Sequence, residues 1–451
     1  MKSVHPEYEN NAPNWSKVRD IIKGEKALKD HDLNNTKSSG YVTNMGDNYV
    51  PYTSRTYEAN DIERYRTYVK RASLFNATRR TEKGMVGMVF NKPANIELPL
   101  SLEYLNQDVD GSGISIIDLT SETLEDILET GRAGLFVDFP VTDGVKTIAE
   151  MADSNFRATI VKYKAEQIMD WRTVSDGATQ KLSYVKLYEI SETQGDTVFE
   201  TNLQATYRVL LLEDGIYKQR EYSDDGSYVE FIPLDNMGEP FDFIPFFFIG
   251  ATDNRPDVDI APLLEIAELN LKHYVNSADY EESIHLVGQP MAGIMGVTQQ
   301  WIEDNYPNGI DFGSRVCIML PPSADIKLIQ ADPNTMASEA MKSKESQMIM
   351  LGARLIQDGS GTETAEAARI RHSADTSTMK VIVNNITNAF IKAIMAVQVF
   401  NGMVDEFTFE LNTDFFTSTL TSQDLTALVS AWQSGAVDSE TMLSKLKSNG
   451  F

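Results

Sequence analysis

The residue types that most often carry chemistry are present in this chain, but their spacing does not assemble a familiar site. The five histidines are scattered, without the H-E-x-x-H or i, i+4 spacing that would turn two imidazoles toward one metal ion. No G-x-x-x-x-G-K-[ST] loop offers the backbone cradle and lysine that hold nucleotide phosphates. We therefore expect no metal centre, no cofactor and no ATPase activity.

One acidic loop resembles the beginning of a calcium-binding EF-hand. Asp108, Asp110 and Ser112 alternate before Gly113, as ligands do in such a loop. The twelfth position is Leu119, however, where an EF-hand requires a bidentate carboxylate. The sequence therefore favours a turn in which aspartate side chains accept hydrogen bonds from nearby backbone N–H groups.

Nucleophilic and acid–base chemistry have no clear candidates either. No G-x-S-x-G elbow marks a serine nucleophile, and Cys317 lies in an apolar strand pattern that is typical of a buried, unreactive thiol. Acidic pairs such as Asp224-Asp225 lie in turns. They have no neighbouring group that would give the two carboxyls different pKa values, as a general acid and a general base require. We expect that the protein is not an enzyme. A hydrolase with a carboxylate pair in the α/β half is the less favoured alternative.

The charge of the chain limits its partners. Its 451 residues include 66 acidic and 40 basic side chains, which gives a formal net charge of −26. Because this charge opposes adsorption to DNA or to an anionic membrane, any nucleic-acid role must depend on geometry. Residues 55–83 are locally basic, and we interpret them as a solvated or subunit-facing helix face rather than a DNA patch. The single cysteine excludes an intrachain disulfide framework.

We expect neither export nor a membrane span. The N-terminus lacks the apolar stretch of a signal peptide. The run 286–302 has no charged residue, but it contains glycine, proline and glutamine. It is therefore a poor lipid-facing helix, which needs roughly 20 apolar residues.

The first half of the chain has the pattern of a mixed α/β protein. Residues 1–55 are polar and turn-rich, a composition that predicts an extended arm with a short helix-like piece around Trp15 to Ala27. Apolar residues at three- and four-residue steps predict helices from Glu58 toward Phe75 and over 119–130, the second ending at Gly131. A buried strand follows at 135–139. Alternating segments with Asp-Gly turns then predict a mostly antiparallel sheet over 159–250.

The second half is mainly helical. Long helices are predicted at 262–286, 335–357 and 363–400, and the first two enclose a small mixed module with a helix from Thr298 and strands at 315–320 and 325–330. Two glycines in Asp358–Thr362 prevent one continuous helix, and Ser360 with Glu363 forms a capping-box pattern that restarts it. A strand from Glu406 and a helical hairpin over 421–447 complete the pattern.

The order of these elements, together with several stretches of sequence, resembles the portal proteins of tailed double-stranded-DNA bacteriophages. The stretches are GRAGLFVDFP at 131–140, the pattern from Tyr163 to Trp171 followed by VKLYE, YRVLLLEDGIY at 207–217, the run 261–290 and ETAEAAR at 363–369. The resemblance covers most of the chain and rests on five matches in order rather than on any single motif.

The resemblance implies an α+β, portal-type fold. Its parts would be an extended N-terminal arm at 1–55, an α/β wing body at 56–260, stem helices at 261–286 and 333–357, a small α/β clip at 287–332, a tunnel loop at 358–362, a long kinked wing helix at 363–403, a return strand at 404–420 and a short helical crown at 421–451.

It also implies a function and partners. Such subunits assemble in the host cytoplasm and form a ring of about twelve at one capsid vertex of the virion, and DNA passes through the ring during packaging and ejection. The implied partners are double-stranded DNA without sequence preference, the terminase packaging motor, the major capsid and scaffolding proteins, and a head–tail adaptor, with no membrane. Another structural head or connector protein of a phage is the main alternative.

The candidate site residues follow from this resemblance. The DNA-facing set comprises Asp358, Gly359, Ser360, Gly361, Thr362, Lys342, Lys344 and Arg354, and the clip docking set comprises Trp301, Glu303, Asp304 and Tyr306. A channel through which any DNA slides must avoid strong phosphate pairing, because each neutralised phosphate adds salt-dependent affinity. The stretch 357–368 fits this requirement, since it contains no Lys or Arg.

Overall fold

The structure of the chain is a computed structural model. It describes residues 3–35, 48–52, 58–139, 157–195, 197, 199–223, 226–235, 237–288, 291–306, 319–329, 335–352, 365–402, 404–413, 415 and 432. The chain divides into two compact units. Unit 1 contains residues 1–16, 81–264 and 355–451, and unit 2 contains residues 17–80 and 265–354.

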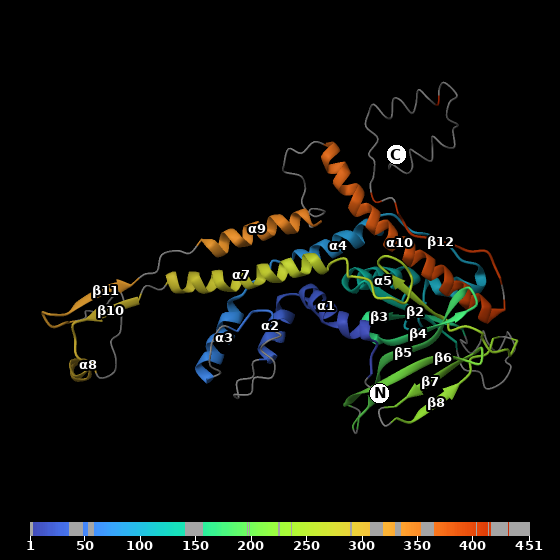
Figure 1. Cartoon of the computed structure of the whole chain (residues 1–451), viewed down its shortest axis with the longest axis horizontal. Coiled ribbons are helices and arrows are strands. Elements are labelled where there is room, and N and C mark those ends of the chain that lie inside the picture. The colour runs from blue at the N-terminus through green and yellow to red at the C-terminus, as the bar shows by residue number, and fades with distance from the viewer. Residues whose placement is uncertain are drawn as a thin grey trace. The chain divides into compact units, whose positions relative to one another are not determined.

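A three-stranded antiparallel sheet forms part of the core of unit 1 (Figure 1). Its middle strand β2 (Arg132–Asp138) pairs with β3 (Thr159–Lys164) on one side and β9 (Phe246–Gly250) on the other. Strand β2 is buried along nearly its whole length, as a short apolar run predicts. Gly131 precedes it with a φ of +75°, and a Cβ there would lie 2.4 Å from the Asp259 carbonyl oxygen, so only glycine fits.

The second sheet of unit 1 is an antiparallel meander of five strands. Its strands, in spatial as well as chain order, are β4 (Ile168–Asp176), β5 (Thr179–Gln194), β6 (Thr201–Glu213), β7 (Ile216–Tyr222) and β8 (Tyr228–Phe231). The two-residue loop between β6 and β7 is Asp214-Gly215, and both residues have positive φ, 54° and 76°. This is the turn that suits the twist of a hairpin, and it confirms the prediction from the Asp-Gly pair.

Helices cover the smaller sheet. Helix α10 (Ala365–Asn401) packs on β9 and β2 and also contacts α5 (Ile116–Thr130). The segment Thr378–Asn401 of α10 is apolar and long enough to cross a membrane, but 56% of its most apolar window is buried within the molecule. Side chains such as Ile386 and Phe390 are fully buried, so packing against the sheet accounts for its composition.

The other elements of unit 1 are short, apart from α4. They are α4 (Ala77–Val89), which begins in unit 2, β1 (Asn95–Glu97), the 3₁₀ helices η2 (Leu100–Asn106) and η3 (Ala165–Gln167), and β12 (Thr408–Glu410), which pairs with β1. Together with the sheets and long helices they confirm an α+β fold class.

The helix-like piece predicted around Trp15 to Ala27 is confirmed, but the extended arm predicted around it is wrong for the rest of residues 6–35, which are also helical. These residues form α1 (Pro6–Lys23) and α2 (Glu25–Asn35), separated by Gly24 with a φ of +107°. Trp15, Val18 and Ile21 are buried at three-residue steps, so they form the inner face of a helix despite the polar composition around them.

Unit 2 is built on helices. Helix α3 (Ala59–Arg71) presents Ile62, Tyr65 and Val69 to the interior, as its periodicity predicts. Helices α7 (Leu264–Gly288) and α9 (Met336–Met350) lie side by side in Figure 1, and a small module at one end of them contains β10 (Met291–Met295), α8 (Gln299–Asn305) and β11 (Asp325–Ile329). Strands β10 and β11 pair in antiparallel fashion.

Several predicted elements lie outside the described residues. They are residues 315–318 of the predicted strand with Cys317, the tunnel loop at 358–362 and the crown helices over 421–447 apart from Trp432. The boundaries of the arm, wing, stem, clip and crown as domains stay predictions.

A buried carboxyl pair joins two helices of unit 1. Glu82 of α4 is 1% exposed and Glu129 of α5 is 7% exposed. Burial, reinforced by the neighbouring Glu129 carboxyl, raises the pKa of Glu82 to about 9. The native state therefore holds a proton at neutral pH that the unfolded chain releases.

We expect Glu82→Gln to make stability less dependent on pH. Because the pKa of Glu82 is raised on folding, its contribution is complete below about pH 4.5 and declines as the pH rises toward 9, by at most about 1.4 kcal/mol per pH unit. Urea unfolding at pH 5.5, 7 and 8.5 should show this slope in the wild type and a smaller one in Glu82→Gln. Exposed Glu103 provides the control variant, Glu103→Gln. Equal slopes in all three proteins would contradict the assignment.

Candidate docking and channel surfaces

The two helices that the resemblance assigns to the stem are linked by a polar contact. His273 of α7 is 1% exposed, and its Nε2 lies 3.2 Å from Oε1 of Glu345 on α9. Met348, one turn further along α9, is fully buried. The pair is therefore packed through one side of each helix, and the remaining surface of α9 is largely exposed.

Polar side chains on α7 also hold the segment between α3 and α4. The Oδ1 atom of Asn270 accepts hydrogen bonds from the backbone N–H of Ala77 and Thr78 and from the Thr78 hydroxyl, at 3.1 to 3.2 Å. Its Nδ2 donates to the Phe75 carbonyl oxygen at 2.8 Å. Asn270 thus satisfies N–H groups at the start of α4, a task that a helix's own N-cap residue usually performs.

The structure locates two of the eight predicted DNA-facing residues. Lys342 on α9 is exposed, whereas Lys344 is half-buried. Positions two residues apart on a helix point about 200° apart, so the two lysines do not share one face. Arg354 and the loop Asp358–Thr362 lie outside the described residues.

The four predicted docking residues lie on or directly after α8. Thr298 caps this helix by accepting a hydrogen bond from the Trp301 N–H at 3.3 Å. The rings of Trp301 and Tyr306 lie 5.8 Å apart, and the Tyr306 hydroxyl bonds the backbone of Met319 in both directions, at 3.1 Å. Glu303 and Asp304 are exposed. The module therefore presents acidic side chains beside a half-buried aromatic pair.

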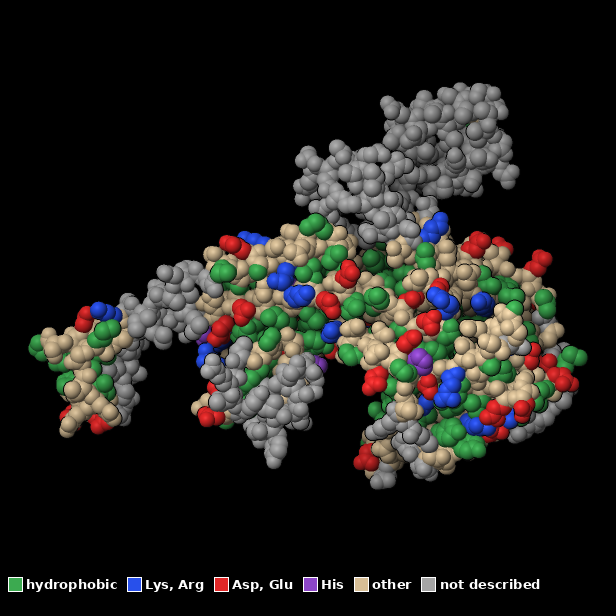
Figure 2. Space-filling view, in the orientation of Figure 1, with side chains coloured by type: hydrophobic (Ala, Val, Ile, Leu, Met, Phe, Trp, Pro, Cys, Tyr) green, Lys and Arg blue, Asp and Glu red, His purple; other side chains and the backbone are tan. Residues whose placement is uncertain are grey.

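Three cations of the basic stretch 55–83 contact acidic side chains in the part that the structure describes. Arg71 contacts Glu282, Arg66 lies 3.9 Å from Glu63, and Lys83 lies 2.6 Å from Glu125. On the face shown in Figure 2, Lys and Arg side chains are interspersed with Asp and Glu rather than gathered in one patch. These contacts favour the interpretation as a helix face over a DNA patch.

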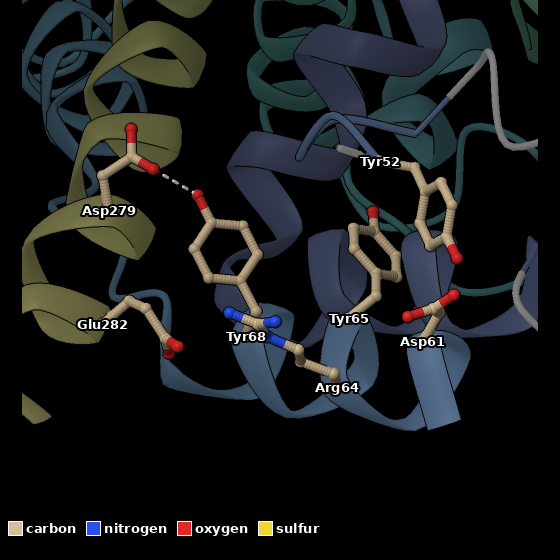
Figure 3. A pocket seen from close by; sticks show the side chains of 7 residues that line it. All are labelled: Tyr52, Asp61, Arg64, Tyr65, Tyr68, Asp279 and Glu282. Atoms are coloured by element: carbon tan, nitrogen blue, oxygen red, sulfur yellow. Dashed lines mark hydrogen bonds between the residues drawn. The ribbon is translucent and has the colours of Figure 1, made fainter. Parts of the chain in front are cut away.

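Unit 2 contains a pocket that the sequence does not predict (Figure 3). Its walls come from α3, α7 and the segment before α3, and the lining residues are Tyr52, Asp61, Arg64, Tyr65, Tyr68, Asp279 and Glu282. The available signal was the spacing of Asp61, Tyr65 and Tyr68, which places three polar or aromatic side chains on one side of a helix. The partners from α7 are more than 200 residues away in sequence, so the pocket itself could not be predicted.

Three carboxylates at the two sheets of unit 1 are arranged around a cation, unlike the Glu82–Glu129 pair. Arg208 of β6 lies 3.0 Å from Asp138, 2.8 Å from Glu189 and 3.2 Å from Glu221. The hydroxyl of Tyr163 also donates to Glu189. Burial raises the pKa of Asp138 even though Arg208 lowers it. This arrangement is that of a structural ion cluster, and it gives the alternative of a hydrolase no specific support.

The EF-hand-like loop is a turn. The Oδ1 atom of Asp108 accepts from the N–H groups of Gly111 and Gly113, both at 2.8 Å, and Asp110 accepts from the N–H of Ser112. The second oxygen of Asp108 contacts Arg157. In the part of the chain that the structure describes, no group of three or more His, Cys, Asp or Glu residues is arranged to hold a metal ion.

Comparisons with known proteins give distant similarities. Residues 262–400, from α7 to α10, match the model of a family described as "Domain of unknown function (DUF4055)". No curated protein matches the chain. Among solved structures, a similar chain occurs in "Neck of empty GTA particle computed with C6 symmetry", with 13% sequence identity and a TM-score of 0.40 over 81% of this chain and 88% of that chain. Another occurs in "Virion of native gene transfer agent (GTA) particle", with 12% sequence identity and a TM-score of 0.41 over 81% of this chain and 89% of that chain.

We expect Asn270→Ala to destabilise unit 2. The substitution removes the acceptor of the buried Thr78 N–H and hydroxyl, whereas the Ala77 N–H still donates to the Phe75 carbonyl oxygen. Leaving the Thr78 donors unsatisfied costs about 1 to 3 kcal/mol. Urea unfolding followed by circular dichroism measures the change. Lys272→Ala, at an exposed position of the same helix, should alter stability by no more than about 0.5 kcal/mol. Equal effects of the two substitutions would show that Asn270 does not hold α4.

Proposed function

We propose that this chain is a non-enzymatic, portal-type subunit of a phage-like particle. Copies of it would form a ring that acts as a DNA channel and as the docking platform for a packaging motor and a head–tail adaptor. The observation that carries the proposal is the order α7, small α/β module, α9 and long α10, which follows the stem, clip, stem and wing-helix order that the sequence resemblance implies.

The geometry of unit 2 supports this proposal. Helices α7 and α9 are joined through His273 and Glu345, and the chain between them forms a separate module at their end. In that module, α8 has no buried residue among its seven. In the described residues of this module, a two-stranded sheet and one short helix without a buried residue provide little core, which suits a segment that is stabilised by contact with other subunits or partners.

The charge pattern supports a channel with weak DNA contact. Strong phosphate pairing would hold a duplex still, because releasing it would require counterions to condense again on the DNA. This chain favours weak phosphate contact instead, because its net charge is −26 and its residues 357–368 include acidic side chains but no Lys or Arg. Lys342, exposed on α9, is the described candidate for a milder attraction.

Ring formation is the primary test. Native mass spectrometry of the purified protein should show a closed oligomer of about twelve subunits, and electron micrographs should show a central channel roughly 20 Å or more across, wide enough for a duplex. Monomers under all salt conditions, also after co-expression with capsid and scaffolding proteins, would contradict the proposal. A ring whose channel is too narrow for a duplex would favour another structural connector.

The loop Asp358–Thr362 provides a second test, in a packaging reaction with the cognate motor. Asp358→Lys should slow packaging in a salt-dependent way, because about twelve added cations would hold phosphates at one level of the ring. Deleting the loop should preserve ring assembly but shorten or release the packaged DNA. The measurement is DNA length per particle, and Glu192→Lys, at an exposed position of β5, controls for the charge change. Wild-type packaging by both loop variants would show that the loop does not face the DNA.

A further inference from the structure

The pocket of unit 2 is a defined cavity with aromatic walls. Its volume is about 300 Å³. The rings of Tyr52 and Tyr65 meet edge to face, with centroids 5.0 Å apart, and in Figure 3 they lie beside each other near Asp61. Tyr68 extends across to α7, where its hydroxyl donates a 2.6 Å hydrogen bond to Asp279. Three phenol rings and three carboxylates therefore surround one space.

The walls are held in place by contacts outside the cavity. The Tyr65 hydroxyl donates to the Val50 carbonyl oxygen and accepts from Asn48 at 2.9 Å, and the ring is 5% exposed. Arg71 contacts Glu282 and keeps that carboxylate at the rim. Because these side chains are already positioned, a ligand would not have to order them on binding.

The cavity is electronegative. Asp61, Asp279 and Glu282 line it together with one cation, Arg64, and Arg71 pairs with Glu282, so these groups carry a formal charge of −1. Burial, together with the neighbouring Asp279 and Glu282, raises the pKa of Tyr68, as expected where negative charge gathers. An anionic ligand would therefore be repelled, whereas a cation would contact the carboxylates of Asp279 and Glu282 and the negative faces of the tyrosine rings.

We propose that this pocket binds a guanidinium or primary ammonium group carried on a flexible stem. The group would lie against the tyrosine rings and donate hydrogen bonds to Asp279 and Glu282. Two sources present this chemistry, a free amine and a lysine or arginine side chain of a second copy of this chain. The inference does not depend on the proposed DNA-channel function.

Ethylguanidine is a suitable probe, and ethylurea is its uncharged counterpart of similar shape. Titration calorimetry with the full chain should show saturable binding of ethylguanidine and none of ethylurea. Asp279→Asn should weaken binding by about threefold or more, because it removes a charge but keeps an acceptor for Tyr68. Arg64→Ala should strengthen binding, since it removes the competing cation.

The opposite directions of the two variants distinguish a binding site from damage to the fold. Lys70→Ala provides the matched control, because it removes a positive charge from α3 at an exposed position that does not line the pocket. Absence of saturable binding, equal binding of ethylurea, or a response of Lys70→Ala equal to that of Arg64→Ala would overturn the proposal.

A second measurement separates the two sources. If a neighbouring copy supplies the cation, ethylguanidine should lower the yield of oligomers while ethylurea does not, and Asp279→Asn should lower it without any additive. If the ligand is a free amine, binding should occur with the oligomer yield unchanged. Both outcomes support the pocket, and they are distinct from a failure of ring formation, which would affect the proposed function alone.

Discussion

The amide of Asn270 is the interaction on which the helices of unit 2 depend, because it satisfies the first N–H groups of α4 from the side of α7. It belongs to a buried polar row, since Asn270, His273 and Ser277 recur at three- and four-residue steps. Asn270 and Ser277 bond the chain between α3 and the start of α4, and the His273 ring lies within hydrogen-bond distance of Glu345 on α9. If this row were apolar, α7 could shift by one turn along its neighbours at little cost in free energy. Hydrogen-bonded polar groups in a low-dielectric interior permit one register, so α7 fixes the positions of α9 and of the chain after α3 together.

In unit 1, charged and aromatic side chains hold the two sheets in place relative to each other. Arg208 ties β6 to Asp138 of the smaller sheet and to Glu189 of its own sheet. Arg132 of β2 lies with its guanidinium 3.6 Å from the ring centre of Trp171 in β4 and 4.6 Å from that of Phe248 in β9. Burial lowers the pKa of Arg132 to about 9. Both arginines therefore connect the two sheets, and replacing either by lysine would lose the planar contacts.

The sequence predicted the elements whose signals are local. The Asp-Gly turn before β7, the glycine that ends α5 and the periodicity of α3 each determine their own conformation, and the structure confirms all three. The sequence underestimated the extent of α1 and α2, because only the piece around Trp15 to Ala27 had a helical pattern within a polar composition. Of the candidate site residues, the structure places those on α8 and α9, but their roles depend on partners. The pocket joins residues 61–68 to 279–282, and only the tertiary fold brings these together.

The division of the chain into units has a consequence for its synthesis. The chain passes between the two units four times, near residues 16, 80, 264 and 354. Neither unit is therefore a continuous piece that a ribosome could complete early. The smaller sheet of unit 1 is finished with β9 at Gly250, but the helix that covers it, α10, begins at Ala365. The ribosome must therefore synthesise more than one hundred residues after β9 before α10 can cover the apolar face of the sheet. During this time the exposed face can associate with other chains. Chaperone protection during translation should therefore matter more for this protein than for one built of sequential domains.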